Sequence, residues 1–170
     1  MTPAFLRALE FTLSVEGGFS NHPQDRGGRT QNGVTQRLYD VWRTTTGQPK
    51  RSVDLIEEDE KQRLAYDEFW TPCNCEALPE PLSHCVFDMA FNSGAWNAKL
   101  TLQRALRVRA DGVIGPVTVQ TAKKTPDAAL EFLKRRGAYI QEVILTRPDQ
   151  VVFLEGWVTR LLLQAWRYAK

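Results

Sequence analysis

The chain has 170 residues, of which 42% are hydrophobic and 25% are charged. This length suits one domain or at most two small ones, and the composition excludes an intrinsically disordered chain. The net charge of +2 is uneven, since residues 1–98 hold 9 Lys and Arg against 14 Asp and Glu, whereas residues 99–170 hold 13 against 6. A basic second half is typical of proteins that bind nucleic acid, a membrane surface or an acidic polymer, but a solvated helical surface has the same composition.

Two classes of segment are missing from the sequence. No apolar run approaches the roughly 20 residues that a membrane-spanning helix needs. The first residues do not resemble a secretory signal, because Glu10 stands where an apolar core would continue. We therefore expect no stable membrane insertion and no cleaved leader.

Apolar spacing predicts a mainly α protein. Thr2-Pro3 has the residue types of an N-cap and a first helical residue, and apolar residues then follow at helical spacing until Gly17-Gly18. Turn-forming residues predominate near residues 19–34, where Gly27-Gly28 and Asn32-Gly33 predict a small irregular β-ribbon. Further helices are predicted at about 34–42 with Thr35 as N-cap, 57–70, 81–92, 96–106, 116–123, 127–145, and 150–168 with a bend at Gly156.

Glu16 stands at the predicted end of the first helix. The carboxyl end of a helix carries partial negative charge, which disfavours the charged form of a nearby carboxylate and raises its pKa. A raised pKa is what a general acid needs at neutral pH, although acidic residues near helix ends are also common without any function.

Asp25 and Thr30 follow Glu16 on the predicted ribbon. A glycoside hydrolase needs an acid for the leaving oxygen and a carboxylate or bound water on the opposite face of the sugar. The alternative is ordinary turn chemistry, in which Asp25 and Thr30 bond only to their own backbone.

The stretch VEGGFSNHPQDRGGRTQNGVT, residues 15–35, resembles the E-G-G-[YF]-x-(N/D)-x-P-x-D-x-G-G-x-T-x-x-G-[IV]-T signature of glycoside hydrolase family 108. The matching positions include Glu16, Gly17, Gly18, Phe19, Pro23, Asp25, Gly27, Gly28, Thr30, Gly33, Val34 and Thr35. This family comprises phage-type N-acetylmuramidases, found in endolysins and related bacterial enzymes.

The resemblance covers nearly the whole chain. Residues 69–94 are similar to a family segment that ends in D-x-x-x-N-x-G, and residues 102–118 with the late G-W-x-x-R pattern resemble its predicted peptidoglycan-binding region. It implies a lysozyme-like helical fold in one compact unit, with a muramidase lobe at 1–98 and a peptidoglycan-binding lobe at 99–170.

The family implies cleavage of the β-1,4 bond between N-acetylmuramic acid and N-acetylglucosamine, with Glu16 as the general acid. The E-x8-D-x4-T spacing is close to the E-x8-D-x5-T triad of phage lysozymes, and by that analogy Asp25 and Thr30 position the water or stabilise charge. Such chemistry requires no metal or organic cofactor. Peptidoglycan thus replaces nucleic acid as the expected partner of the basic half.

Asp88, Asn92 and Trp70 are secondary candidates for substrate binding. Asp88 and Asn92 lie four residues apart on one predicted helix face and would bond sugar N-acetyl groups, unless they are buried polar residues between helices. Trp70 and Trp96 would stack on sugar rings, but tryptophans of a helical protein lie mostly in the core.

Three other sequence features each allow a functional and a purely structural interpretation. Cys73, Cys75, His84 and Cys85 could ligate zinc, but the one-residue gap between the first two is too short for the usual pattern, and free thiols are the alternative. The D-G-x-x-G-P-x-T run at residues 111–118 is either a peptidoglycan-binding loop or a simple turn. The basic run at residues 134–136 contacts wall polymers or covers a solvated helix face.

Other activities remain open at this point. A lytic transglycosylase, a non-catalytic peptidoglycan-binding module and a zinc-dependent amidase are the alternatives. We expect a monomer that is made in the cytoplasm and acts on the wall in the periplasm, reached through an export helper such as a holin or a secretion system.

Overall fold

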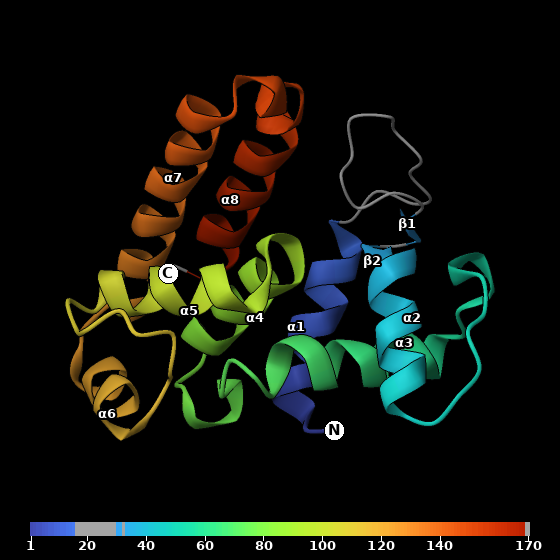
Figure 1. Cartoon of the computed structure of the whole chain (residues 1–170). Helices are drawn as coiled ribbons and strands as arrows, with labels where there is room; N and C mark the ends of the chain where they lie inside the picture. Colours follow the sequence, from blue (N-terminus) through green and yellow to red (C-terminus); the bar gives the residue numbers. More distant parts are fainter. Residues whose placement is uncertain (16–29, 32, 169–170) are drawn as a thin grey trace.

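The computed structural model describes residues 1–15, 30–31 and 33–168, and helices dominate this part of the chain (Figure 1). The mainly α, lysozyme-like fold class expected from the sequence is confirmed. The α-helices are α1 (Pro3–Ser14), α2 (Gln36–Thr45), α3 (Glu58–Ala65), α4 (Leu82–Ser93), α5 (Ala95–Ala105), α6 (Pro116–Lys124), α7 (Ala128–Thr146) and α8 (Leu154–Tyr168). Shorter elements are β1 (Thr30–Gln31), β2 (Val34–Thr35), η1 (Val53–Leu55), η2 (Tyr66–Trp70), η3 (Cys75–Ala77) and η4 (Pro148–Phe153).

Helix α4 is the centre of the core. Every residue from 82 to 91 is buried, because the helix packs against α1, α5, α7 and α8. A helix that is apolar on most sides is stable only when other elements surround it. Its Phe87 ring packs edge-on against Phe5 of α1 and Trp70 of η2.

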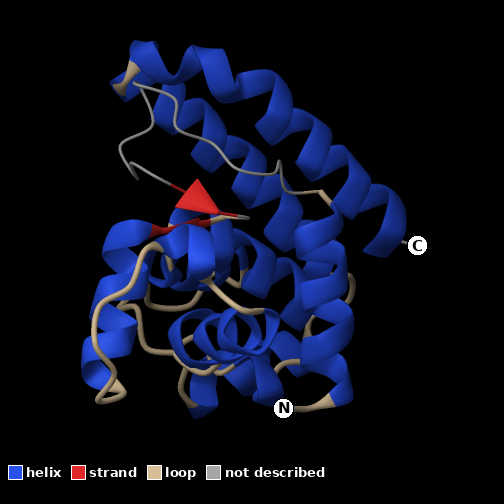
Figure 2. Cartoon of the chain, turned by 90° about the vertical axis from the view of Figure 1, so that its right-hand side faces the viewer, coloured by secondary structure: helices blue, strands red, loops and turns tan. Residues whose placement is uncertain are grey.

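Helices α7 and α8 lie side by side and stand on the layer formed by α4 and α5 (Figure 1). The view turned by 90° shows the same pair above the remaining helices (Figure 2). On the other side of α4 lie α1 and then α2 and α3. No helix within the described residues is long and apolar enough to cross a membrane.

Local sequence signals set the two predicted N-caps. The Thr2 hydroxyl accepts a hydrogen bond from the Phe5 N–H at 3.4 Å, and the Thr35 hydroxyl accepts one from the Leu38 N–H at 3.2 Å. The predicted ribbon is present where it is described, with β1 and β2 antiparallel and Gly33 at a φ of 81° between them. Residues 19–29 of that ribbon lie outside the described residues.

Three predicted helix boundaries are wrong. Val34 belongs to β2, because Thr35 caps the helix that follows. The helix predicted over 57–70 changes into a π-helical turn at Tyr66, where the Thr71 N–H reaches back to the Tyr66 carbonyl oxygen. The last helix begins at Leu154, after a 3₁₀ segment, and not at the predicted residue 150.

Candidate functional site

Helix α1 ends at Ser14, one cap residue before Glu16. Arg160 of α8 holds this end, since its Nη2 donates to the Thr12 carbonyl oxygen at 3.2 Å and its Nη1 to the Val15 carbonyl oxygen at 3.5 Å. Glu16 and Asp25 themselves lie outside the described residues, and so does the Thr30 side chain, although the backbone of Thr30 belongs to β1. The structure thus shows how the chain is anchored on both sides of the signature, and the roles of these three residues stay predictions.

A buried ionic cluster around Asp88 supports that anchor. The Asp88 carboxylate accepts hydrogen bonds from Arg136 Nη1 at 2.6 Å, Arg160 Nη2 at 2.6 Å and the Thr12 hydroxyl at 3.0 Å. Arg136 Nη1 also donates to the side-chain amide oxygen of Gln164, Oε1, at 2.6 Å. These residues come from α1, α4, α7 and α8, so the cluster ties four helices together.

The charge state of Asp88 follows from its neighbours. Complete burial alone raises the pKa of its carboxyl group, but the positive charges and hydrogen bonds of Arg136 and Arg160 outweigh burial and bring the pKa below its ordinary value. Asp88 is therefore an anion between two cations at neutral pH. Arg160 also brings positive charge to the end of α1, which offsets part of the helix-end effect that the sequence argument used for Glu16.

The structure places two of the three residues predicted to bind substrate, Asp88 and Trp70, in the core. Asp88 is 0% exposed and its oxygens already accept hydrogen bonds from protein groups, so it acts as a link between helices. Trp70 is 1% exposed, packs against Phe5 and Phe87, and donates from its indole N–H to Glu76 at 3.1 Å. An indole with both faces covered in the core offers no surface for a sugar ring.

Asn92 is exposed at the end of α4 and lines a pocket between α4, α5, α7 and α8. This pocket has a volume of about 270 Å³ and reaches Arg136 of the Asp88 cluster. Of Asp88, Asn92 and Trp70, Asn92 is thus the one placed where a ligand can reach it. Arg136 is 4% exposed, so of the two interpretations of the basic run at residues 134–136, a solvated helix face does not apply to this member.

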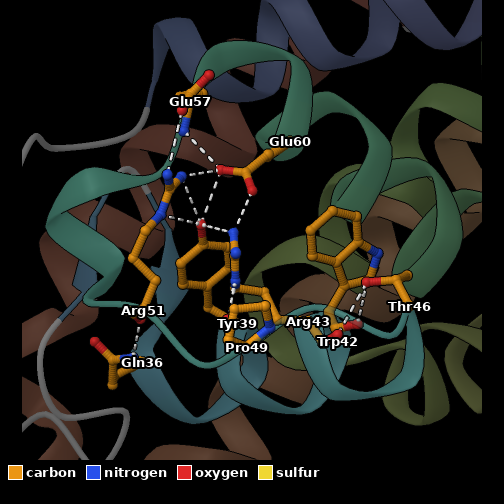
Figure 3. A network of polar contacts seen from close by, with 9 residues as sticks. All are labelled: Gln36, Tyr39, Trp42, Arg43, Thr46, Pro49, Arg51, Glu57 and Glu60. Atoms are coloured by element: carbon orange, nitrogen blue, oxygen red, sulfur yellow. Dashed lines mark hydrogen bonds and ion pairs between the residues drawn. The ribbon is translucent and has the colours of Figure 1, made fainter.

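A second polar network braces the segment after β2 (Figure 3). Glu60 of α3 accepts a hydrogen bond from the Tyr39 hydroxyl at 2.8 Å and pairs with both Arg43 and Arg51. Burial alone raises the pKa of Glu60, but a backbone N–H, the Tyr39 hydroxyl and the two arginines lower it below its ordinary value. Gln36, the residue after β2, accepts from the Val53 N–H at 2.7 Å and donates to the Arg51 carbonyl oxygen at 2.9 Å. These bonds join β2 and α2 to η1 and α3.

The cysteines are free thiols, and all three are buried. Burial, together with the neighbouring Cys73 thiol, raises the pKa of Cys75. Burial likewise raises the pKa of Cys85. Within the described residues, no group of three or more His, Cys, Asp or Glu side chains is arranged to hold a metal ion. The arrangement of these side chains therefore does not support a zinc site at Cys73, Cys75, His84 and Cys85.

The loop at residues 111–115 is organised by the buried Gln103 of α5. The Gln103 amide nitrogen donates to Asp111 at 2.7 Å and to the Val113 carbonyl oxygen at 3.0 Å, and its carbonyl oxygen accepts from the Gly112 N–H at 2.8 Å. Gly112 has a φ of 74°, and a Cβ there would lie 2.3 Å from the Trp96 ring. The turn reading therefore explains this glycine, and the exposed Trp96 ring lies over it.

Sequence reasoning missed two residues of this region. Arg147, for which the sequence pattern indicates only a break between helices, lines the pocket beside Asn92. Gln103 holds the loop at residues 111–115 through three hydrogen bonds. No local pattern marks either residue. A buried glutamine at an apolar helix position is the one signal that could have indicated a polar contact at Gln103.

Comparisons with known proteins identify two matching families and a similar solved structure. The glycosyl hydrolase 108 family matches residues 9–94, and a family described as a predicted peptidoglycan domain matches residues 97–162. No curated protein sequence matches the chain. Among solved structures, Brucella abortus SagA is 27% identical with a TM-score of 0.80, and the match covers 96% of this chain and 92% of SagA. The chain therefore belongs to the glycosyl hydrolase 108 family, carries a peptidoglycan domain after the hydrolase region, and is a glycoside hydrolase that acts on peptidoglycan.

Proposed function

We propose that the protein is an N-acetylmuramidase that cleaves the β-1,4 bond between N-acetylmuramic acid and N-acetylglucosamine. The observation that carries the proposal is the signature at residues 15–35, whose first matching position is Glu16. That signature lies inside the region matched by the hydrolase family. We further propose that the enzyme acts in the periplasm, where the wall lies.

In this mechanism Glu16 protonates the glycosidic oxygen while an oxocarbenium-like transition state develops on the sugar. Asp25 and Thr30 hold the attacking water or stabilise the developing charge. The hydrogen bonds from Arg160 to the Thr12 and Val15 carbonyl oxygens support this assignment, because they fix the backbone directly before Glu16. A positioned acid accelerates proton transfer by about 10²–10⁴-fold, and that effect depends on such fixed geometry.

The test replaces Glu16 with glutamine. We expect Glu16→Gln to lower the rate of turbidity loss on permeabilised Gram-negative cells by at least about 10²-fold while sedimentation with purified walls is unchanged. Glu10→Gln is the matched control, because Glu10 is an exposed glutamate on the same helix, and it should keep full activity.

Three outcomes would change the assignment. Lysis by Glu16→Gln at the wild-type rate would remove Glu16 from the mechanism. Wall binding without lysis by the wild type would favour a binding module. Mass spectrometry of the products separates hydrolysis from transglycosylation, because only a lytic transglycosylase leaves 1,6-anhydro ends.

A further inference from the structure

The described residues that line the pocket beside Asn92 all follow the signature in the sequence. Its described lining residues run from Asn92 at the end of α4 to Trp157 of α8. It thus spans the end of the region matched by the hydrolase family and the region matched by the peptidoglycan domain. A substrate that extends across both matched regions could therefore contact the residues of this pocket.

The charged side chains among the described lining residues of the pocket are all positive. Arg136 and Arg147 both line it, and no Asp or Glu is found among its described lining residues. Asp88 neutralises Arg136, whose Nη1 lies 2.6 Å from the carboxylate. The Arg147 guanidinium, by contrast, has no hydrogen-bond or ion-pair partner within the described part of the chain. A guanidinium in a recess without an acidic partner favours a ligand that brings a carboxylate.

The rest of the lining suits a small polar group with an apolar side. Asn97 and Gln150 provide amide groups, Ile140 and Val143 provide apolar surface, and Trp157 provides an aromatic edge. The volume of about 270 Å³ lies just below the range of about 300–1,000 Å³ usual for pockets that enclose a whole small molecule. The pocket therefore fits a side group of a polymer better than a complete muropeptide.

Resting on the proposed function, we propose that this pocket binds a carboxylate on the peptide stem of peptidoglycan, with Arg147 as its main partner. In the intact polymer the lactyl carboxyl group of muramic acid is consumed in the amide bond to the peptide, so the free carboxylates lie on the stems. Arg136 connects the pocket to the hydrolase region, since the Asp88 carboxylate that it contacts also binds Arg160 at the end of α1. Stem recognition and glycan cleavage would thus share one rigid group of side chains.

The test measures binding of N-acetylmuramoyl-L-alanyl-D-isoglutamine to the full chain by isothermal titration calorimetry. This probe carries a free carboxylate and no β-1,4 glycosidic bond, so its binding does not depend on catalysis. We expect Arg147→Gln to weaken binding about tenfold, which corresponds to about 1.4 kcal/mol. Arg104→Gln, the same change at an exposed position on α5, should stay within about twofold of the wild type.

A second ligand isolates the carboxylate. The same compound with its carboxyl group converted to an amide should bind the wild type about tenfold more weakly and should be insensitive to Arg147→Gln. Equal affinities of the acid and the amide for the wild type would overturn the proposal. So would unchanged binding by Arg147→Gln, or no binding by the wild type at millimolar concentration.

A spectroscopic measurement keeps the proposal testable if Arg147→Gln does not fold. The acid should shift the NMR signal of the Trp157 indole N–H in the wild type, and a titration that leaves this signal in place contradicts binding in the pocket. Failure here is distinct from failure of the proposed function. A protein that binds the acid but releases no glycan products refutes only the muramidase assignment, and one that cleaves the glycan but ignores the acid refutes only the pocket.

Discussion

Replacing Asp88 with asparagine tests whether the buried cluster holds the helices together. The side chain keeps its volume, but the negative charge that Asp88 places between Arg136 and Arg160 is lost, and an amide NH₂ cannot accept from their N–H groups. Removing one partner from a buried ion pair costs about 3–5 kcal/mol, because the remaining charge stays desolvated and unpaired. Since a domain is stable by about 5–15 kcal/mol in total, this change consumes a large share of the stability.

The size of the effect is measured by thermal unfolding. For a chain of this length, 1 kcal/mol shifts Tm by about 2–4 °C, so we expect Asp88→Asn to melt about 6–20 °C below the wild type. Glu131→Gln is the control, because Glu131 forms an exposed pair with Lys134 at 2.7 Å and such pairs contribute about 0–1 kcal/mol. A Tm within about 2 °C of the wild type for Asp88→Asn would refute the structural role.

The pH dependence gives a second measure of the same cluster. Because the folded state holds the pKa of Asp88 below its ordinary value, the stabilisation is fully present above about pH 3.9, the value of an unfolded aspartate. It is lost as the pH falls through the lower pKa of the folded state. Below about pH 4 we therefore expect the difference in unfolding free energy between the wild type and Asp88→Asn to shrink. A constant difference from pH 7 to pH 2 would contradict the ionised state of Asp88.

Two further predictions concern stability. Burial lowers the pKa of His84, although the charge of Glu80 acts in the opposite direction, so the folded state favours the neutral ring. The neutral ring's contribution to the free energy of unfolding is fully present above about pH 6.5 and is lost as the pH falls through the lower pKa of the folded state. We expect His84→Phe to flatten the dependence of Tm on pH between about pH 6.5 and 5, and parallel profiles would exclude His84 as its source. Gln103→Met leaves the Gly112 N–H and the Val113 carbonyl oxygen without their partner and should cost about 2–4 kcal/mol in urea unfolding. The exposed Gln120→Met should stay within about 0.5 kcal/mol, and equal losses for the two variants would rule out the loop contacts as the cause.

Features set by neighbouring residues were predictable from the sequence. The caps at Thr2 and Thr35 need only a hydroxyl and an N–H three residues later, and the strands around Gly33 need only a residue that tolerates a positive φ. The spacing of apolar residues located the helices for the same reason. The π-helical turn at residues 66–70 was not visible, because a shift in hydrogen bonding within a helix leaves the side-chain pattern almost unchanged.

In the candidate site, too, some residues were predictable from the sequence and others were not. The signature marked Glu16, Asp25 and Thr30 because a motif is a local pattern, and what it predicts for them awaits the activity measurements. The partners of Asp88 could not be found, since Arg136 lies 48 residues away and Arg160 lies 72. An aspartate four residues before an asparagine predicts a polar helix face. The sequence pattern is the same whether that aspartate faces solvent or faces two buried arginines. Burial, which separates those cases, is a property of the packed helices alone.

The Asp88 cluster also bears on how the two matched regions depend on each other. Thr12 and Asp88 lie in the part matched by the hydrolase family, while Arg136 and Arg160 lie in the part matched by the peptidoglycan domain. Separating the two parts would break these buried pairs and would expose to water the apolar surface along which α4 packs against α5 and α7. Because Arg160 also binds the carbonyl oxygens at the end of α1, the second part supplies a support for the proposed acid as well as a surface for the wall. We therefore expect the proposed lobes at 1–98 and 99–170 to fold as one unit, in which loosening α8 disturbs cleavage even where wall binding persists.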